Sequence, residues 1–117
     1  MEYLFLCAYG ENRSPTGAYI AQNIARRKGL DIRMSYGCIK PFLDELEMCP
    51  VEILIDKLRK HLDSFDRIFV MEEYMAEGIV GVGISRDKIN CLDIPDEYKR
   101  NEPVLEKLLE EKLRTLI

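Results

Sequence analysis

Short apolar segments alternate with longer amphipathic ones along this chain, and that alternation constrains the fold more than any other feature. Apolar segments of strand length lie at residues 3–7, 31–36, 67–71 and 88–94. Segments with helical spacing follow them, at about residues 14–29, 50–62, 72–78 and 103–117. Strands buried on both faces read as continuous apolar runs. Their alternation with helices predicts an α/β fold, a four-stranded parallel sheet covered on both faces by helices.

Local residues predict where the first helix begins and ends, and where regular structure stops. Ser14 followed by Pro15 is typical of an N-cap and a first helical position. Gly29 is typical of the residue that ends a helix. Residues 37–49 are expected to be irregular, because Gly37 and Pro41 interrupt them early, and Pro50 is expected to start the next helix.

Length and composition limit the function classes. The 117 residues are expected to form one domain, 1–117, with a single core. The formal charge is 17 − 21 = −4, so no basic field favours nucleic acid or an anionic membrane as a partner. No apolar run is long enough for a membrane span, and the N-terminus lacks a basic signal-type start. A cytoplasmic location is therefore expected, and the oligomeric state is left open.

The cysteines and the histidine do not predict a metal centre. Cys7, Cys38, Cys49 and Cys91 form no C-x-x-C pair, and His61 is the one histidine of the chain. Zinc sites usually need paired ligands at short spacing. A disulfide framework is also not expected in a cytosolic chain with an ample core. We therefore expect no metal and no cofactor.

The first apolar segment ends in a motif of the form C-x5-R-S. Cys7 is followed by a polar loop, and Arg13 and Ser14 stand where a helix begins. A strand–loop–helix junction turns backbone N–H groups inward and forms an anion cradle, and Arg13 can add a bidentate clamp on phosphate oxygens. A thiol close to these donors is favoured as the thiolate, the nucleophilic form. Ser14 can hydrogen-bond that sulfur or cap the helix. The expected phosphate-binding loop is Ala8, Tyr9, Gly10, Glu11, Asn12 and Arg13.

A simpler interpretation makes Cys7 a buried hydrophobe and Arg13 a surface residue. The topology favours the catalytic one, because ligands bind beyond the carboxyl ends of parallel strands and right-handed crossovers put all those ends at one edge. The loop after Cys7 and the late "LDIPDEY" loop should therefore meet.

These motifs resemble the low-molecular-weight protein tyrosine phosphatase family, in particular short members that combine "CxxxxxRSPT" with "LDIPDEY". The segments "SYG" after the second strand and "DRIFVM" at the third extend the resemblance to nearly the whole chain. The resemblance implies a flavodoxin-like sheet and a cysteinyl-phosphate mechanism without metal or cofactor. The sequence also departs from the family that it resembles. Gly10 stands where members usually carry a loop-bracing asparagine, and Asn12 stands where some carry a second cysteine. Gly17-Ala18 stands where members often have a glutamate.

Cleavage of a phosphate ester also needs an acid for the leaving oxygen. Asp93 and Asp96 both follow the fourth strand. The resemblance favours Asp96, since Asp96-Glu97-Tyr98 matches the register of the family's acid, with Glu97 in place of the usual proline. Asp93, nearer the strand end, is the alternative acid. Pro-Asp is also a common turn pair, which would explain Asp96 without catalysis.

Aromatic side chains suggest the substrate. Tyr9 in the loop and Tyr98 after the acid could form a wall against a phenyl ring, or could be ordinary surface packing. The favoured function is hydrolysis of phosphotyrosine or another aryl phosphate, in a protein or a small molecule, with inorganic phosphate as a product. Two alternatives stay open. One is an arsenate reductase on the same loop, and the other is a phosphate- or phosphotyrosine-binding module with little turnover.

Overall fold

The computed structural model describes residues 1–48 and 52–117, and these residues form a four-stranded parallel sheet. The strands are β1 (Glu2–Cys7), β2 (Arg33–Cys38), β3 (Arg67–Val70) and β4 (Ile89–Cys91). Their spatial order is β2-β1-β3-β4, and each neighbouring pair is parallel. The predicted α/β class and parallel sheet are therefore confirmed.

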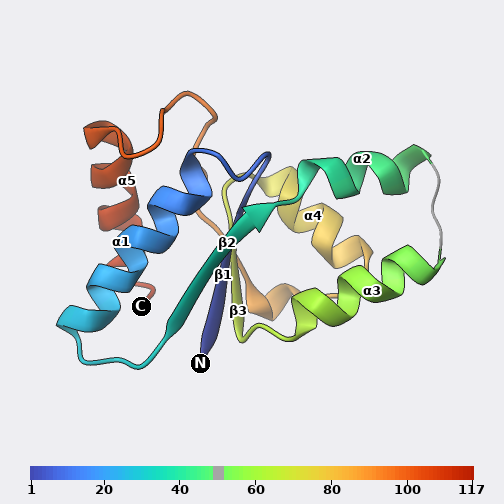
Figure 1. The fold of residues 1–117 in the computed structure, drawn as a ribbon, viewed down its shortest axis with the longest axis horizontal. Helices are drawn as coiled ribbons and strands as arrows, with labels where there is room; N and C mark the ends of the chain where they lie inside the picture. The colour runs from blue at the N-terminus through green and yellow to red at the C-terminus, as the bar shows by residue number, and fades with distance from the viewer. Residues whose placement is uncertain (49–51) are drawn as a thin grey trace.

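Helices cover both faces of this sheet. They are α1 (Arg13–Arg27), α2 (Lys40–Met48), α3 (Glu52–Asp63), α4 (Glu73–Gly81) and α5 (Pro103–Leu113), with a short 3-10 helix at Arg86–Lys88. α1 and α5 lie on one face, whereas α2, α3 and α4 lie on the other (Figure 1). In the part of the chain that the structure describes, no helix has the length and apolar character needed to cross a membrane.

Two expectations about the second strand and the segment after it are wrong. β2 runs two residues further than predicted, and α2 begins at Lys40, inside the segment expected to be irregular. Gly37 does not break the strand, because it pairs in register with Leu6 of β1. Pro41 lies in the first turn of α2, where its missing N–H costs no helical hydrogen bond. Pro50, the expected start of the next helix, lies outside the described residues.

The start of α1 also differs from the prediction. Asn12 occupies the N-cap position, so Ser14 lies within the helix and Pro15 in its first turn. The Ser14 hydroxyl does not cap the helix, because it lies against Cys7 and the Gly37 carbonyl. This two-residue shift places Arg13 on the helix rather than in the loop before it.

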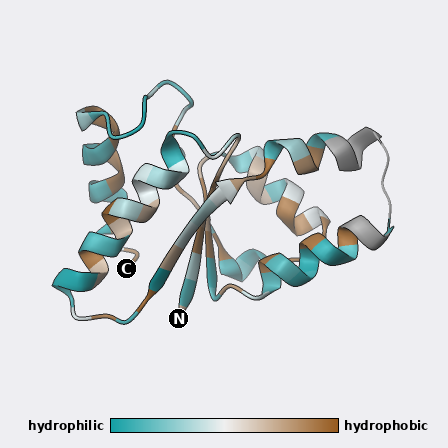
Figure 2. Ribbon diagram, viewed as in Figure 1, coloured by the Kyte–Doolittle hydropathy of each residue, from teal (hydrophilic) through white to brown (hydrophobic). Residues whose placement is uncertain are grey.

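The core lies between the sheet and the two helical layers. The rings of Phe5 and Phe69, from β1 and β3, stack with their centroids 4.7 Å apart. α1 approaches this pair closely at Gly17, where an added Cβ would lie 3.0 Å from Phe5. Apolar residues follow the strands and the inward helix faces, while the outward faces are hydrophilic (Figure 2). The missing side chain of Gly17 thus allows the helix that carries Arg13 to pack close to the sheet.

Candidate active site

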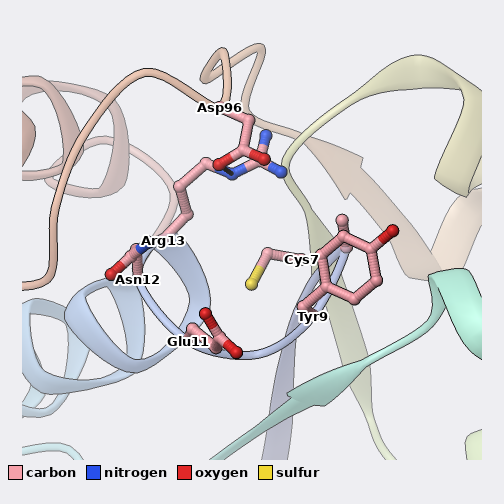
Figure 3. A pocket seen from close by; sticks show the side chains of 7 residues that line it. Cys7, Tyr9, Glu11, Asn12, Arg13 and Asp96 are labelled. Carbon is pink, nitrogen blue, oxygen red and sulfur yellow. Dashed lines mark ion pairs between the residues drawn. The ribbon is translucent and has the colours of Figure 1, made fainter.

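The carboxyl end of β1 opens into a small pocket formed by two loops that are distant in sequence. One loop joins β1 to α1, and the other joins β4 to α5. The residues that line the pocket are Cys7, Ala8, Tyr9, Glu11, Asn12, Arg13 and Asp96. In Figure 3 the sulfur of Cys7 lies inside the curve of the first loop, and Asp96 lies beside the Arg13 guanidinium. The structure therefore brings together the two loops that the topology predicted to meet.

Cys7 is buried, and its sulfur is surrounded by hydrogen-bond donors. The backbone N–H of Gly10 donates to Cys7 Sγ at 3.1 Å. The hydroxyl of Ser14, which is fully buried, lies 3.0 Å from the same sulfur and 3.2 Å from the carbonyl oxygen of Gly37. Its proton can go to either partner. A thiolate at this position would accept from the Gly10 N–H, and also from the Ser14 hydroxyl when its proton points to the sulfur.

The loop backbone is held open by the start of the β2–α2 connection. Cys7 O accepts from Ile39 N at 3.1 Å, and Ala8 O accepts from Lys40 N at 3.0 Å. In a planar trans peptide the next N–H points opposite to the carbonyl. The amides of Ala8 and Tyr9 therefore point away from that connection. Gly10 has a φ of +71°, a conformation that glycine adopts without strain.

Arg13 is almost completely buried, with 1% of its surface exposed, and acceptors surround its guanidinium. Nη1 donates to the Glu72 carboxylate and, at 2.7 Å, to the carbonyl oxygen of Ile94. Nε lies 3.8 Å from Asp96 Oδ1. The contacts on Nη1 fix the plane of the guanidinium, and they leave the Nε–Nη2 edge for a ligand with paired oxygens.

The two aspartates considered as acids lie in different surroundings. Asp96 lines the pocket and is 57% exposed at its side chain. Asp93 is exposed, has a φ of +54°, and accepts from Cys91 Sγ at 3.4 Å. It does not line the pocket. Burial, the larger cause, and the nearby Asp93 carboxylate raise the pKa of the Cys91 thiol to about 11, so that thiol stays protonated at neutral pH.

The two tyrosines considered as walls also differ. Tyr9 lines the pocket and is 59% exposed, whereas Tyr98 packs partly buried against the core and does not line the pocket. A third tyrosine, Tyr74 of α4, was not considered in the sequence analysis. It lies near Glu72 and Arg13 but does not line the pocket. Its pKa is raised by burial and then by the Glu72 carboxylate, and is influenced in the opposite direction by Arg13. Lys40 lies 6.0 Å from the centre of the Tyr74 ring.

Glu72 is a further residue that the sequence reasoning missed, and Cys38 is one that it considered only with the other cysteines, without placing it beside Cys7. Glu72 follows β3 after one residue, so the rule that placed the other two loops at this edge would have found it. Cys38 ends β2 and is paired in register with Cys7. Across residues 1–48 and 52–117, no group of three or more His, Cys, Asp or Glu side chains could hold a metal ion.

Comparison with known proteins gives structural matches only. No family model matches the sequence, and no curated protein sequence matches it. A low molecular weight protein tyrosine phosphatase from Bacillus subtilis matches with a TM-score of 0.70 and 22% identity, over 99% of this chain and 94% of that one. The YwlE arginine phosphatase, a Bacillus subtilis protein, matches with a TM-score of 0.67 and 22% identity, over 99% and 93%.

A third solved structure, Vibrio vulnificus Wzb in complex with benzylphosphonate, has a TM-score of 0.65 and 17% identity. The match covers 98% of this chain and 95% of Wzb. The chain therefore has the fold of the low-molecular-weight protein tyrosine phosphatases over nearly its whole length.

Proposed function

We propose that the protein is a cysteine-dependent phosphatase that hydrolyses aryl phosphate monoesters such as phosphotyrosine. The observation that carries this proposal is the convergence of Cys7, Arg13 and Asp96 on one pocket. A thiol, a buried guanidinium with one edge available and an exposed carboxyl are the nucleophile, the anion clamp and the acid that such a reaction needs.

In the first half of the reaction, the Cys7 thiolate attacks phosphorus in line with the ester oxygen. The S–P bond forms as the P–O bond to the aryl group breaks, and Asp96 gives its proton to the departing oxygen. The loop amides and the Nε–Nη2 edge of Arg13 hold the three non-bridging oxygens, where charge accumulates in the transition state.

In the second half, water attacks the cysteinyl phosphate. Asp96, now ionised, takes a proton from that water, and the S–P bond breaks to release inorganic phosphate and the Cys7 thiolate. Protons and charge balance over the cycle, and neither a metal nor a cofactor enters it. Two similar proteins support this chemistry. The YwlE structure is of a C7S mutant with a phosphorylated active-site serine, and Wzb was solved in complex with benzylphosphonate.

The nucleophile assignment predicts that Cys7→Ser lowers kcat for p-nitrophenyl phosphate by at least about a thousandfold in the presence of a chelator. Acid quenching of the wild-type reaction with labelled substrate should trap phosphate on Cys7. Cys91→Ser is the matched control and should keep full activity, because the Cys91 thiol has a pKa of about 11 and lies outside the pocket. Full activity in Cys7→Ser would disprove the mechanism.

The acid assignment predicts that Asp96→Asn lowers kcat for phenyl phosphate by about a hundredfold or more, since general acid catalysis typically contributes that much. The effect should be much smaller with p-nitrophenyl phosphate, whose leaving group needs little protonation. Asp93→Asn is the control, because asparagine tolerates the positive φ at that position. Equal losses in the two variants would contradict the choice of Asp96.

The register of Cys38 beside Cys7 favours arsenate reduction as a second candidate. Reduction of arsenate to arsenite takes two electrons, which oxidation of these two thiols to a disulfide could supply, with an external dithiol restoring them. Dithiol-dependent arsenite formation that Cys38→Ser abolishes would favour this candidate. Binding of a phosphopeptide without turnover of phosphopeptide or arsenate would favour a binding module instead.

A further inference from the structure

Asn12 caps α1 in an unusual way. An N-cap asparagine normally accepts a hydrogen bond from its own helix through its side chain. Asn12 makes no such bond. Its Oδ1 instead accepts from the backbone N–H of Arg100 at 2.9 Å, 88 residues away. The side chain of Asn12 thus binds the loop that carries Asp96 and not its own helix.

Thr16, one turn further along α1, makes a second connection to the same loop. Its side chain is completely buried, and its hydroxyl donates to Asn12 O at 2.8 Å. Thr16 Oγ1 also accepts a hydrogen bond from the backbone N–H of Asn101 at 3.0 Å. Loss of this hydroxyl would leave the backbone N–H of Asn101 without its partner in a part-buried contact between the two loops.

The position of Asp96 follows from these connections. On its N-terminal side the loop is anchored at Ile94, whose N–H donates to Met71 O at 2.8 Å and whose carbonyl accepts from Arg13. On its C-terminal side it is anchored at Arg100 and Asn101 by Asn12 and Thr16. Asp96 has a largely exposed side chain and no comparable contact of its own apart from Arg13 at 3.8 Å.

We infer that Asn12 and Thr16 are positioning residues that hold Asp96 over the Cys7 pocket by binding the backbone of Arg100 and Asn101. This inference rests on the proposed function, because it assigns a role in proton transfer from Asp96. It also gives Asn12 a positioning role, which differs from the role of the second cysteine that some low-molecular-weight phosphatases carry at this position of the loop. Arg100 adds a contact of its own, since its Nη2 lies 3.3 Å from Tyr36 Oη.

The test compares two substrates in variants that differ by one atom group. Thr16→Val removes the hydroxyl at nearly constant volume, and Thr16→Ser retains it. In Thr16→Val, kcat for phenyl phosphate should fall about tenfold more than kcat for p-nitrophenyl phosphate, because only the poorer leaving group depends strongly on the acid. Thr16→Ser should restore the ratio. Thr115→Val, which removes an exposed hydroxyl in the turn after α5, is the control and should not change it.

A double-mutant cycle separates positioning from general damage. In an Asp96→Asn background, Thr16→Val should leave the substrate ratio unchanged, because no acid is left to misplace. Should Thr16→Val fail to fold, Asn12→Ala, with Asn12→Asp as the variant that keeps the acceptor oxygen, carries the same comparison. Amide hydrogen exchange should also quicken about tenfold at Asn101 in Thr16→Val and at Arg100 in Asn12→Ala.

The outcomes distinguish this inference from the proposed function. Wild-type protein that hydrolyses neither substrate would overturn the function, and the acid-positioning role with it. An active wild type whose substrate ratio does not change in Thr16→Val or Asn12→Ala would overturn the positioning role alone. Equal losses on both substrates that persist in the Asp96→Asn background would also overturn it.

Discussion

Arg13 is a buried charge whose neutralisation depends on one carboxylate more than on any other. Glu72 contacts Nη1 directly and is 34% exposed, whereas Asp96 stands 3.8 Å away and is mostly in solvent. A buried guanidinium without a close counter-charge is costly, and loss of one partner from a buried pair typically destabilises by several kcal/mol. Glu72 is therefore the residue that makes the buried clamp tolerable in the absence of a ligand.

We predict that Glu72→Ala lowers the free energy of unfolding by about 3 kcal/mol. Inorganic phosphate should restore more stability to this variant than to the wild type, because the anion replaces the lost counter-charge beside Arg13. Glu73→Ala is the control. Its partner Arg86 is 54% exposed, so that pair is expected to contribute less than about 1 kcal/mol. Urea titrations with and without phosphate measure both effects, and equal losses in the two variants would contradict this account of Arg13.

The loop after β1 is an element whose shape depends on the neighbouring strand. An added Cβ at Gly10 would lie 3.2 Å from the carbonyl carbon of Gly37 and 3.3 Å from Cys38 N. These are backbone atoms, which cannot move aside as a side chain can. The same loop packs through its carbonyls against Ile39 and Lys40. Positive φ and close packing therefore both favour glycine at this position.

We predict that Gly10→Ala lowers kcat/KM for aryl phosphates by at least tenfold, because strain of about 1–2 kcal/mol would be relieved by a change in loop shape. Gly29→Ala is a matched control, since its φ of +70° is nearly the same but nothing lies within 4 Å of the added Cβ. It should cost stability alone. Steady-state kinetics and thermal unfolding separate the two, and comparable activity losses would show that φ rather than packing matters.

Patterns within single elements allowed the sheet, its helices and the Cys7 loop to be predicted, because strand and helix periodicity and the C-x5-R-S spacing are local. The errors arose where a local signal had two meanings. Gly37 and Pro41 suggested irregular structure, yet one pairs within β2 and the other lies in the first turn of α2. The same edge rule could have placed Glu72 near the site, but not its pairing with Arg13, 59 positions away. The role of Thr16 could not be predicted, because it depends on a contact with a residue 85 positions away.

On the scale of the whole molecule, charge opposes the proposed substrate. The formal net charge is −4, and Glu11 and Asp96 both line the pocket that would receive a phosphate dianion. Arg13 and the loop amides act at contact distance, whereas the repulsion acts over longer distances and is screened by salt. Approach to the site, rather than binding within it, is the step that this charge distribution hinders.

We predict that kcat/KM for phenyl phosphate rises about twofold as sodium chloride increases from about 0.01 to about 0.15 M, over which the screening length falls from about 30 to about 8 Å. Glu11→Gln should reduce this dependence, while Glu97→Gln, outside the pocket lining, should change it less. Kinetics at constant pH and several salt concentrations make the comparison. A fall in kcat/KM with salt would mean that Arg13 and Lys40 dominate the approach.

Because the chain is synthesised from its N-terminus, Arg13 is made well before the residues that bury and bind it. Its acceptors Glu72 and Ile94 lie 59 and 81 residues closer to the C-terminus. A growing polypeptide would therefore expose the Cys7 loop and its arginine long before the residues that fix that arginine have been made. The thiol and its clamp come together as a site only after Ile94 has been synthesised, so a product terminated before that residue would carry the nucleophile without the groups that fix Arg13.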